Sequence, residues 1–327
     1  MHASLLDLLA CPDCRDSLEL AAAETEGGDI VTGTLACRGC GRTHPVVGGI
    51  PRFVAMENYA TSFGYQWNRF RGEQIDAANG TRLSEDRLYG ETGWRREWLP
   101  GRWILDVGCG AGRFLEVVSR EKCRAVGVDL SRAVDAARLT LKDRGNVDLV
   151  QASIEALPFK PGAFDLCYCI GVIQHTPSPR RSLAALPAMV KSGGRLAVTI
   201  YERRRWTTLN AKYLVRPITR RMNKRALLLA IQALMPLLFP LTEVLFRLPL
   251  AGRLFAFAIP VANYVGEARL SIGQRYRWAV LDTFDMLSPE YDRPQTESEA
   301  AEALARGGLA GIVRRQAAGL TLAGIKP

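Results

Sequence analysis

The sequence predicts an α/β protein with a doubly wound, mainly parallel sheet. Two observations support this prediction. Short apolar segments alternate with helical segments between residues 102 and 201, and the first apolar segment runs into a glycine-rich turn. The chain has 327 residues, of which 48% are hydrophobic and 23% charged, so it can bury a large core and is neither intrinsically disordered nor collagen-like.

The expected elements of the sheet follow from this alternation. Residues from Arg102 onward begin with a strand, a glycine-rich turn and an amphipathic helix, and four more strands are expected at 124–130, 146–153, 164–172 and 194–201. Helices are expected around 131–143 and 180–191. After a long interruption the pattern resumes in 297–327 with one helix and two last strands, which complete the sheet.

The interruption, residues 202–296, carries most of the net charge of +10: residues 202–225 hold nine Lys/Arg and one acid. Such a segment is typical of a solvated helix face or of contact with phosphate, lipid head groups or RNA. Residues 226–242 are uncharged and mostly apolar, just short of a membrane span, and Pro236 and Pro240 are expected to break the run. We expect helices that cap the substrate mouth, with a membrane span or a membrane-surface helix as alternatives.

Residues 1–58 contain two Cys-x-x-Cys pairs with 22 residues between them. Each pair can sit on a tight turn, so that four thiolates converge on one tetrahedral ion, and so short a segment needs a metal to hold it together. The sequence therefore predicts a structural Zn²⁺ site in which His44 is not needed. Its ligands would be Cys11, Cys14, Cys37 and Cys40. We expect this zinc ribbon to be a separate domain whose loss leaves cofactor binding largely intact.

Residues 59–101 are rich in aromatic side chains and end at Pro100-Gly101. They are expected to form linker helices or a lid over a ligand, with Phe63, Tyr65 and Trp67 facing inward.

The glycine-rich turn has the spacing G-x-G-x-G, which differs from the dinucleotide-binding G-x-G-x-x-G. It follows Asp106, and its glycines let a ligand approach the backbone at a helix N-terminus. Asp129 ends the next strand 23 residues after Asp106, where a ribose diol needs a carboxylate acceptor.

These segments resemble class I S-adenosylmethionine-dependent methyltransferases, in particular those of the ubiquinone-pathway type. The motifs are LDVGCGAGRF, VGVDLS, LPF before an FD strand, and KSGGRLAV. The resemblance implies a seven-stranded Rossmann-like methyltransferase sheet with an antiparallel last strand, and S-adenosyl-L-methionine as cofactor. The cofactor-binding residues that it implies are Asp106, Gly108, Cys109, Gly110, Gly112, Asp129, Leu130, Ser153, Ile154 and Ile170.

The resemblance also implies what these residues do. The three glycines would line the methionine part, Asp106 would hold the ammonium group through a local network, and Asp129 would bind both ribose hydroxyls. Ser153 and Ile154 would flank the adenine, although many relatives carry Asp at the position of Ser153. Ile170 would offer a backbone contact.

The cysteine-containing segment, with its HPVVGGIPRFV, resembles small zinc-ribbon proteins that activate RNA and protein methyltransferases as partner subunits. A ribosomal-RNA methyltransferase family also carries such a ribbon, which makes RNA an alternative substrate. Two features count against RNA. Residues 1–58 hold eight acids and four Lys/Arg, and residues 170–177 lack the Asn-Pro-Pro-Tyr loop that base-amine methyltransferases often use.

His175 is the expected general base, because it follows a central strand at the carboxyl end, and a structural histidine is the alternative. Tyr201, Asp285 and Tyr291 are the next candidates, the last two in a loop expected at 281–296 together with Asp282 and Asp292. The sequence thus predicts a methyltransferase acting on a small or lipid-like acceptor at oxygen. An RNA methyltransferase and a non-catalytic cofactor-binding protein are the alternatives.

The eight cysteines and the absence of a secretory signal favour the cytoplasm, with a peripheral contact to the inner face of the membrane through 203–262 as a further option.

Overall fold

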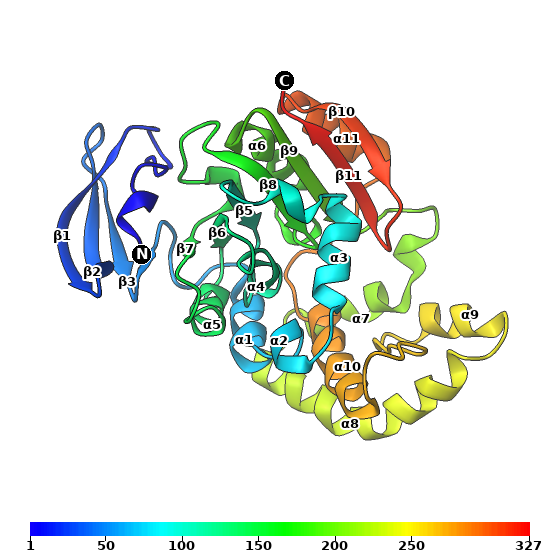
Figure 1. Cartoon of the computed structure of the whole chain (residues 1–327). Coiled ribbons are helices and arrows are strands. Elements are labelled where there is room, and N and C mark those ends of the chain that lie inside the picture. Colours follow the sequence, from blue (N-terminus) through cyan, green and yellow to red (C-terminus); the bar gives the residue numbers. More distant parts are fainter.

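The computed structural model describes residues 1–327 and shows two sheets (Figure 1). The smaller sheet is antiparallel, in the order β1-β2-β3-β4, and lies at the N-terminal side of the molecule. Its strands are β1 (Leu18–Glu26), β2 (Asp29–Cys37), β3 (Thr43–Val47) and β4 (Ile50–Pro51).

The larger sheet has seven strands in the order β10-β11-β9-β8-β5-β6-β7. Pairs among β5 to β9 are parallel, whereas β11 is antiparallel to both of its neighbours, so the predicted seven-stranded topology with an antiparallel last strand is confirmed. The strands are β5 (Trp103–Val107), β6 (Arg124–Asp129), β7 (Val147–Gln151), β8 (Phe164–Ile170), β9 (Val190–Ile200), β10 (Ala310–Arg315) and β11 (Leu320–Ile325).

The helix expected at 180–191 ends early. α6 (Pro179–Ala185) gives way to a 3₁₀ turn, Leu186–Met189, that contains Pro187, and β9 begins at once. Proline cannot continue the α-helical hydrogen bonds, which explains the difference.

Helices cover both faces of the larger sheet, and each face has its own buried core. One core joins the strands to α6 and α11 (Glu297–Arg306), and the other joins them to α3 (Leu83–Thr92), α4 (Arg113–Val118) and α5 (Ala133–Thr140). The remaining helices are α1 (Thr61–Arg69), α2 (Asp76–Asn79), α7 (Ala211–Thr219), α8 (Lys224–Leu245), α9 (Ala251–Ala258) and α10 (Ile272–Leu287).

The zinc ribbon is not packed as a separate unit. Its buried side chains, including Leu5, Leu9 and Leu35, belong to the same core cluster as Val128 of β6 and Ile154 in the turn after β7. The chain then pairs with the edge strand β7, where the backbone N–H of Phe53 donates to the carbonyl of Gln151 at 2.8 Å. The shared core argues against the expected independence of the ribbon, because the apolar face of so small a sheet is buried on its neighbour.

Two expectations for residues 202–296 are wrong. α8 continues through Pro236 and Pro240. Both prolines lie on its exposed side, where carbonyls that lose their helical donor can bond water instead. Asp282 and Asp285 lie in α10 and not in a loop, because a capping box at Ser271 starts a helix that runs to Leu287.

α8 is long and apolar enough to cross a membrane by length and composition, and 33% of its most apolar window is buried inside the protein.

Candidate active site

The four predicted zinc ligands come together in the ribbon. Their Sγ atoms all lie within 4.8 Å of one another. The Sγ atoms of Cys11 and Cys40 are 3.7 Å apart and those of Cys14 and Cys37 are 3.3 Å apart. A tetrahedral zinc ion with bonds of about 2.3 Å separates its sulfur ligands by about 3.8 Å, so the four side chains fit a structural zinc. His44 is buried and stacks on Phe53, with ring centroids 4.7 Å apart.

The glycine-rich turn leaves β5 and enters α4 with three glycines at positive φ. A side chain at Gly108 would place a Cβ 2.2 Å from the Val172 side chain, and one at Gly110 would lie 3.1 Å from the indole nitrogen of Trp67. Only glycine fits these two positions, and both line a large cavity at the carboxyl ends of the strands.

Asp129 lies at the end of β6 and also lines this cavity. Its carboxylate accepts hydrogen bonds from the backbone N–H of Gly110 at 3.0 Å, from the N–H of Ser131 at 2.8 Å and from the Ser131 hydroxyl at 2.7 Å. Oδ1 accepts both bonds from Ser131 and Oδ2 accepts the one from Gly110, so Oδ2 keeps a lone pair for a further donor, such as a ribose hydroxyl. Burial raises the pKa of Asp129 above the ordinary value for aspartate.

The structure brings most of the predicted cofactor-binding residues to the cavity, and these are Gly108, Cys109, Gly110, Asp129, Leu130, Ile154 and Ile170. Three of the predicted residues do not line it. Asp106 is buried in the sheet, where burial raises its pKa to about 8. A Cβ at Gly112 would lie 2.9 Å from Leu141, and the Ser153 hydroxyl accepts the N–H of Glu155 at 3.2 Å. The turn, Asp129 and Ile154 together fit an S-adenosyl-L-methionine molecule.

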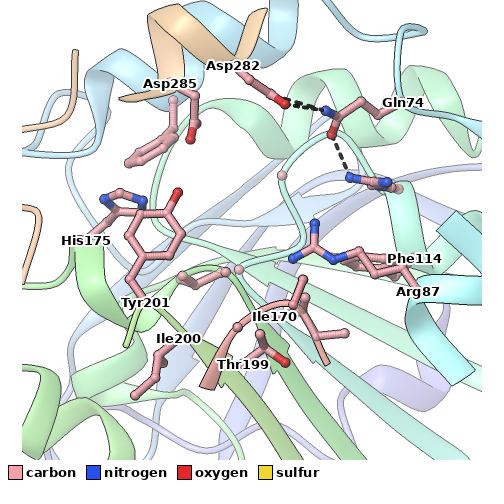
Figure 2. A pocket seen from close by; sticks show the side chains of 18 of the residues that line it. Gln74, Arg87, Phe114, Ile170, His175, Thr199, Ile200, Tyr201, Asp282 and Asp285 are labelled. Atoms are coloured by element: carbon pink, nitrogen blue, oxygen red, sulfur yellow. Dashed lines mark hydrogen bonds between the residues drawn. The ribbon is translucent and has the colours of Figure 1, made fainter. Parts of the chain in front are cut away.

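The cavity continues past the turn to a second group of polar side chains, and its volume is about 1050 Å³. His175, Tyr201 and Asp285 lie on one side of it (Figure 2). The His175 ring packs between Phe63 and Tyr201, with centroids 5.0 and 5.6 Å away. Asp285 accepts a hydrogen bond from the Gln66 amide at 2.9 Å.

The hydrogen bonds of His175 fix its tautomer. Nδ1 lies 2.9 Å from the backbone carbonyl of Tyr291, which can only accept, so Nδ1 carries the proton. Nε2 is then a free acceptor, and it has no partner within the protein. Burial lowers the pKa of His175, which keeps the ring neutral at physiological pH.

Two predicted side chains lie elsewhere. Tyr291 does not line the main cavity: its ring stacks edge-on against Tyr59 at 5.3 Å, and only its carbonyl serves His175. Tyr65 packs on Phe284 of α10, whereas Phe63 and Trp67 line the cavity as expected of a lid. On a helix, residues two apart point to different sides, which explains why the three aromatics cannot all face inward.

Sequence reasoning missed a polar network across the cavity from His175. The Gln74 amide nitrogen donates to Asp282 at 3.2 Å, and its oxygen accepts from Arg113 at 2.8 Å (Figure 2). Arg87 lies beside them and pairs with Glu91 at 2.8 Å. Burial raises the pKa of Asp282 to about 7. The sequence pointed only to the Asp282 segment, because polar residues scattered over a turn and three helices give no local motif.

Lys212 is another cavity residue without a sequence signal. Its ammonium group pairs with Asp292 at 2.7 Å and lies 4.6 Å from the centroid of the Tyr201 ring.

Comparisons with known proteins agree with this geometry. Residues 105–198 match the family model of a methyltransferase domain, and residues 2–49 match that of Trm112p-like proteins. These two matches fall on the segments whose motifs resemble a methyltransferase and a zinc-ribbon activator, as expected from the sequence.

Curated relatives include ubiquinone biosynthesis O-methyltransferases. That of Pectobacterium carotovorum is 32% identical over 133 residues, which cover 38% of this chain and 56% of the relative. That of Burkholderia thailandensis is 36% identical over 99 residues, which cover 29% and 43%. The chain spans about half the length of the curated relatives it matches.

A solved complex of the Haloferax volcanii Trm112 methyltransferase activator with a methyltransferase is 14% identical, with a TM-score of 0.45, and the match covers 81% of this chain and 97% of that one. At this TM-score the likeness carries no argument.

Proposed function

We propose that this protein is an S-adenosylmethionine-dependent methyltransferase that transfers a methyl group to an oxygen of a small or lipid-like acceptor. The observation that carries the proposal is one continuous cavity. It is lined by the glycine-rich turn and Asp129 and also by His175, whose buried Nε2 has no hydrogen-bond partner within the protein. A cofactor site and a candidate proton acceptor thus lie beside the same cavity.

When bound, S-adenosyl-L-methionine supplies an electrophilic methyl group. Asp129, the turn and Ile154 would hold it, and Trp67 beside Gly110 would shield it from water. His175 Nε2 would accept the proton of the acceptor hydroxyl, while the Tyr291 carbonyl stabilises the resulting imidazolium through Nδ1. Tyr201 and Asp285 lie on the same side of the cavity as His175 and would orient that hydroxyl (Figure 2).

The lining of the cavity supports a partly apolar acceptor. Of its 47 lining residues, 26 are hydrophobic. The polar side chains form two groups, with His175, Tyr201 and Asp285 on one side and Gln74, Arg87 and Asp282 across from them. No residue of the ribbon, 1–58, lines the cavity, so nothing in the site favours RNA over a small molecule.

We also infer a location in the cytoplasm. All eight cysteines are free, and four of them form the proposed zinc site, which requires reduced thiolates.

The test uses purified protein, S-adenosyl-L-methionine with a radioactive methyl group, and a total lipid and metabolite extract of the source cells. We expect label in an extractable product whose mass exceeds that of its precursor by one methyl group, and release of the label by alkaline hydrolysis, for a methyl ester, or by hot hydriodic acid, for a methyl ether, should assign it to oxygen. Label in RNA but not in the extract would replace this proposal with the alternative. No binding of the cofactor by calorimetry would refute it.

A further inference from the structure

α8 is apolar on two opposite sides. One side packs on α10 through a helical stripe of buried residues, namely Leu228, Ile231, Met235, Phe239 and Thr242. The other side is exposed and carries no charge from Ala226 to Leu241, with Leu237 70% and Val244 64% exposed. A helix that is apolar all round is normally buried in a core or in lipid, and here only one side is covered by protein.

The exposed apolar surface extends beyond α8. Of the 19 large hydrophobic residues that are exposed in the whole protein, 12 lie between Trp206 and Leu254. Leu250 is fully exposed in the turn between α8 and α9, and Leu254 of α9 is 66% exposed. Single exposed leucines are ordinary, but such a cluster marks a surface that meets another apolar phase. We call the exposed sides of α7, α8 and α9 the apolar face.

Arginines border the apolar face. Residues 202–262 contain 11 Lys/Arg and two acids, which accounts for nearly all of the net charge of +10. Arg205, Arg221, Arg225 and Arg253 are exposed and form no ion pair. Basic side chains beside an exposed apolar helix are typical of helices that lie in the plane of an anionic membrane surface. Two copies packed through this face would bring like charges together, which disfavours self-association.

The apolar face also adjoins the cavity. In Figure 1, α8 and α9 lie along the edge of the molecule opposite the C-terminal strands. Ala256 of α9 and the following Ile259 and Val261 line the cavity, whereas Leu254 of the same helix points to solvent. A molecule in contact with α9 is therefore next to the acceptor side of the cavity.

We propose that the apolar face docks on an anionic lipid bilayer, with α8 lying in the plane of the interface and α9 holding the cavity beside the lipid. The acceptor would then be an amphiphile that enters from the bilayer, its apolar part along α9 and its hydroxyl toward His175. The identity of the acceptor rests on the proposed function, whereas docking does not.

The test is sedimentation of the full-length protein with vesicles of phosphatidylcholine and phosphatidylglycerol in equal parts. The wild type should bind, and less so at high salt. Each leucine-sized side chain withdrawn from lipid weakens partitioning about tenfold. The triple variant Leu237→Gln, Val244→Gln, Leu254→Gln should therefore lose binding by at least about a hundredfold. The matched control, Leu139→Gln with Val313→Gln, changes similarly exposed residues outside the apolar face and should bind like the wild type.

The charge contribution is read separately. Arg221→Glu with Arg225→Glu should abolish the preference for anionic over pure phosphatidylcholine vesicles. A photoreactive fatty acid in the vesicles should crosslink to α8 and to 251–262, and crosslinks confined to the ribbon or to the C-terminal strands would overturn the orientation.

Three results would overturn docking. The first is that the wild type does not bind the vesicles. The second is that the control variant loses as much vesicle binding as the triple variant. The third is that light scattering shows a dimer of the wild type and a monomer of the triple variant, while both bind vesicles equally. Vesicle binding needs neither cofactor nor acceptor. Failure of S-adenosyl-L-methionine binding in calorimetry without lipid would instead refute the proposed function and leave docking in place.

Discussion

Replacing Asp129 with alanine should weaken the binding of S-adenosyl-L-methionine by roughly 1.5–3 kcal/mol, the range for hydrogen bonds to a charged group. The carboxylate already accepts three hydrogen bonds from Gly110 and Ser131, which fix its position before any ligand arrives. Its remaining lone pair, on Oδ2, would accept a ribose hydroxyl, and water entering the alanine variant would recover part of the binding free energy that is lost. The expected change in Kd is about 10- to 150-fold.

Isothermal calorimetry measures this change, and thermal unfolding without ligand shows whether the variant folds. Asp165→Ala is a suitable control, because Asp165 pairs with Lys191 at 3.0 Å near the opposite ends of the strands. It should lower stability and leave the Kd unchanged. Burial raises the pKa of Asp129, so its carboxylate takes up a proton at a higher pH than an ordinary aspartate does. As the pH is lowered, the affinity of the wild type for the cofactor should therefore begin to fall at that higher pH. Unchanged affinity in Asp129→Ala, or preference for a nicotinamide dinucleotide, would refute the reasoning.

Three further predictions concern other parts of the molecule. His175→Gln should lower turnover by roughly 10²–10⁴-fold with unchanged cofactor affinity. Burial lowers the pKa of His175, so the turnover of the wild type should decline only at a pH below that at which an ordinary histidine takes up its proton. Elemental analysis should find about one zinc per chain, and Cys11→Ser should lose it and also weaken cofactor binding in calorimetry, since the ribbon shares a core with Ile154. Burial raises the pKa of Asp282 to about 7, so the folded state holds a proton that the unfolded state releases, and stability falls as pH rises toward that value. Asp282→Asn should therefore raise the unfolding temperature near about pH 8 and change it little near about pH 4.

The strands and the cofactor turn could be predicted from the sequence because their signals are local. An apolar run that ends in G-x-G-x-G, and a second run that ends in Asp129, carry both the fold and the site within a few residues. The cysteine spacing is equally local, and it correctly brought four thiolates together.

The acceptor side of the cavity could not be predicted in this way. Its polar residues come from the turn before α2 and from α3, α4 and α10, so their meeting depends on how these segments pack. Pro289 and the acidic residues made 281–296 resemble a loop. The capping box at Ser271 and the buried side chains of α10 instead stabilise a helix that continues to Leu287. On the acceptor side of the cavity, tertiary packing and not local composition thus determines the secondary structure.

The position of the ribbon links the zinc site to the cofactor site. Phe53 extends the sheet beyond β7, and Arg52 bonds Gln151 at 2.7 Å and Asp135 at 2.6 Å. The Gln151 amide in turn donates to the carbonyl of Leu130, the residue after Asp129, and Asn58 donates to the same carbonyl at 3.0 Å. The chain that leaves the ribbon therefore holds the loop that carries Asp129, the carboxylate proposed to bind the ribose. A zinc ion far from the cavity can thereby keep the cofactor pocket in shape without touching the ligand.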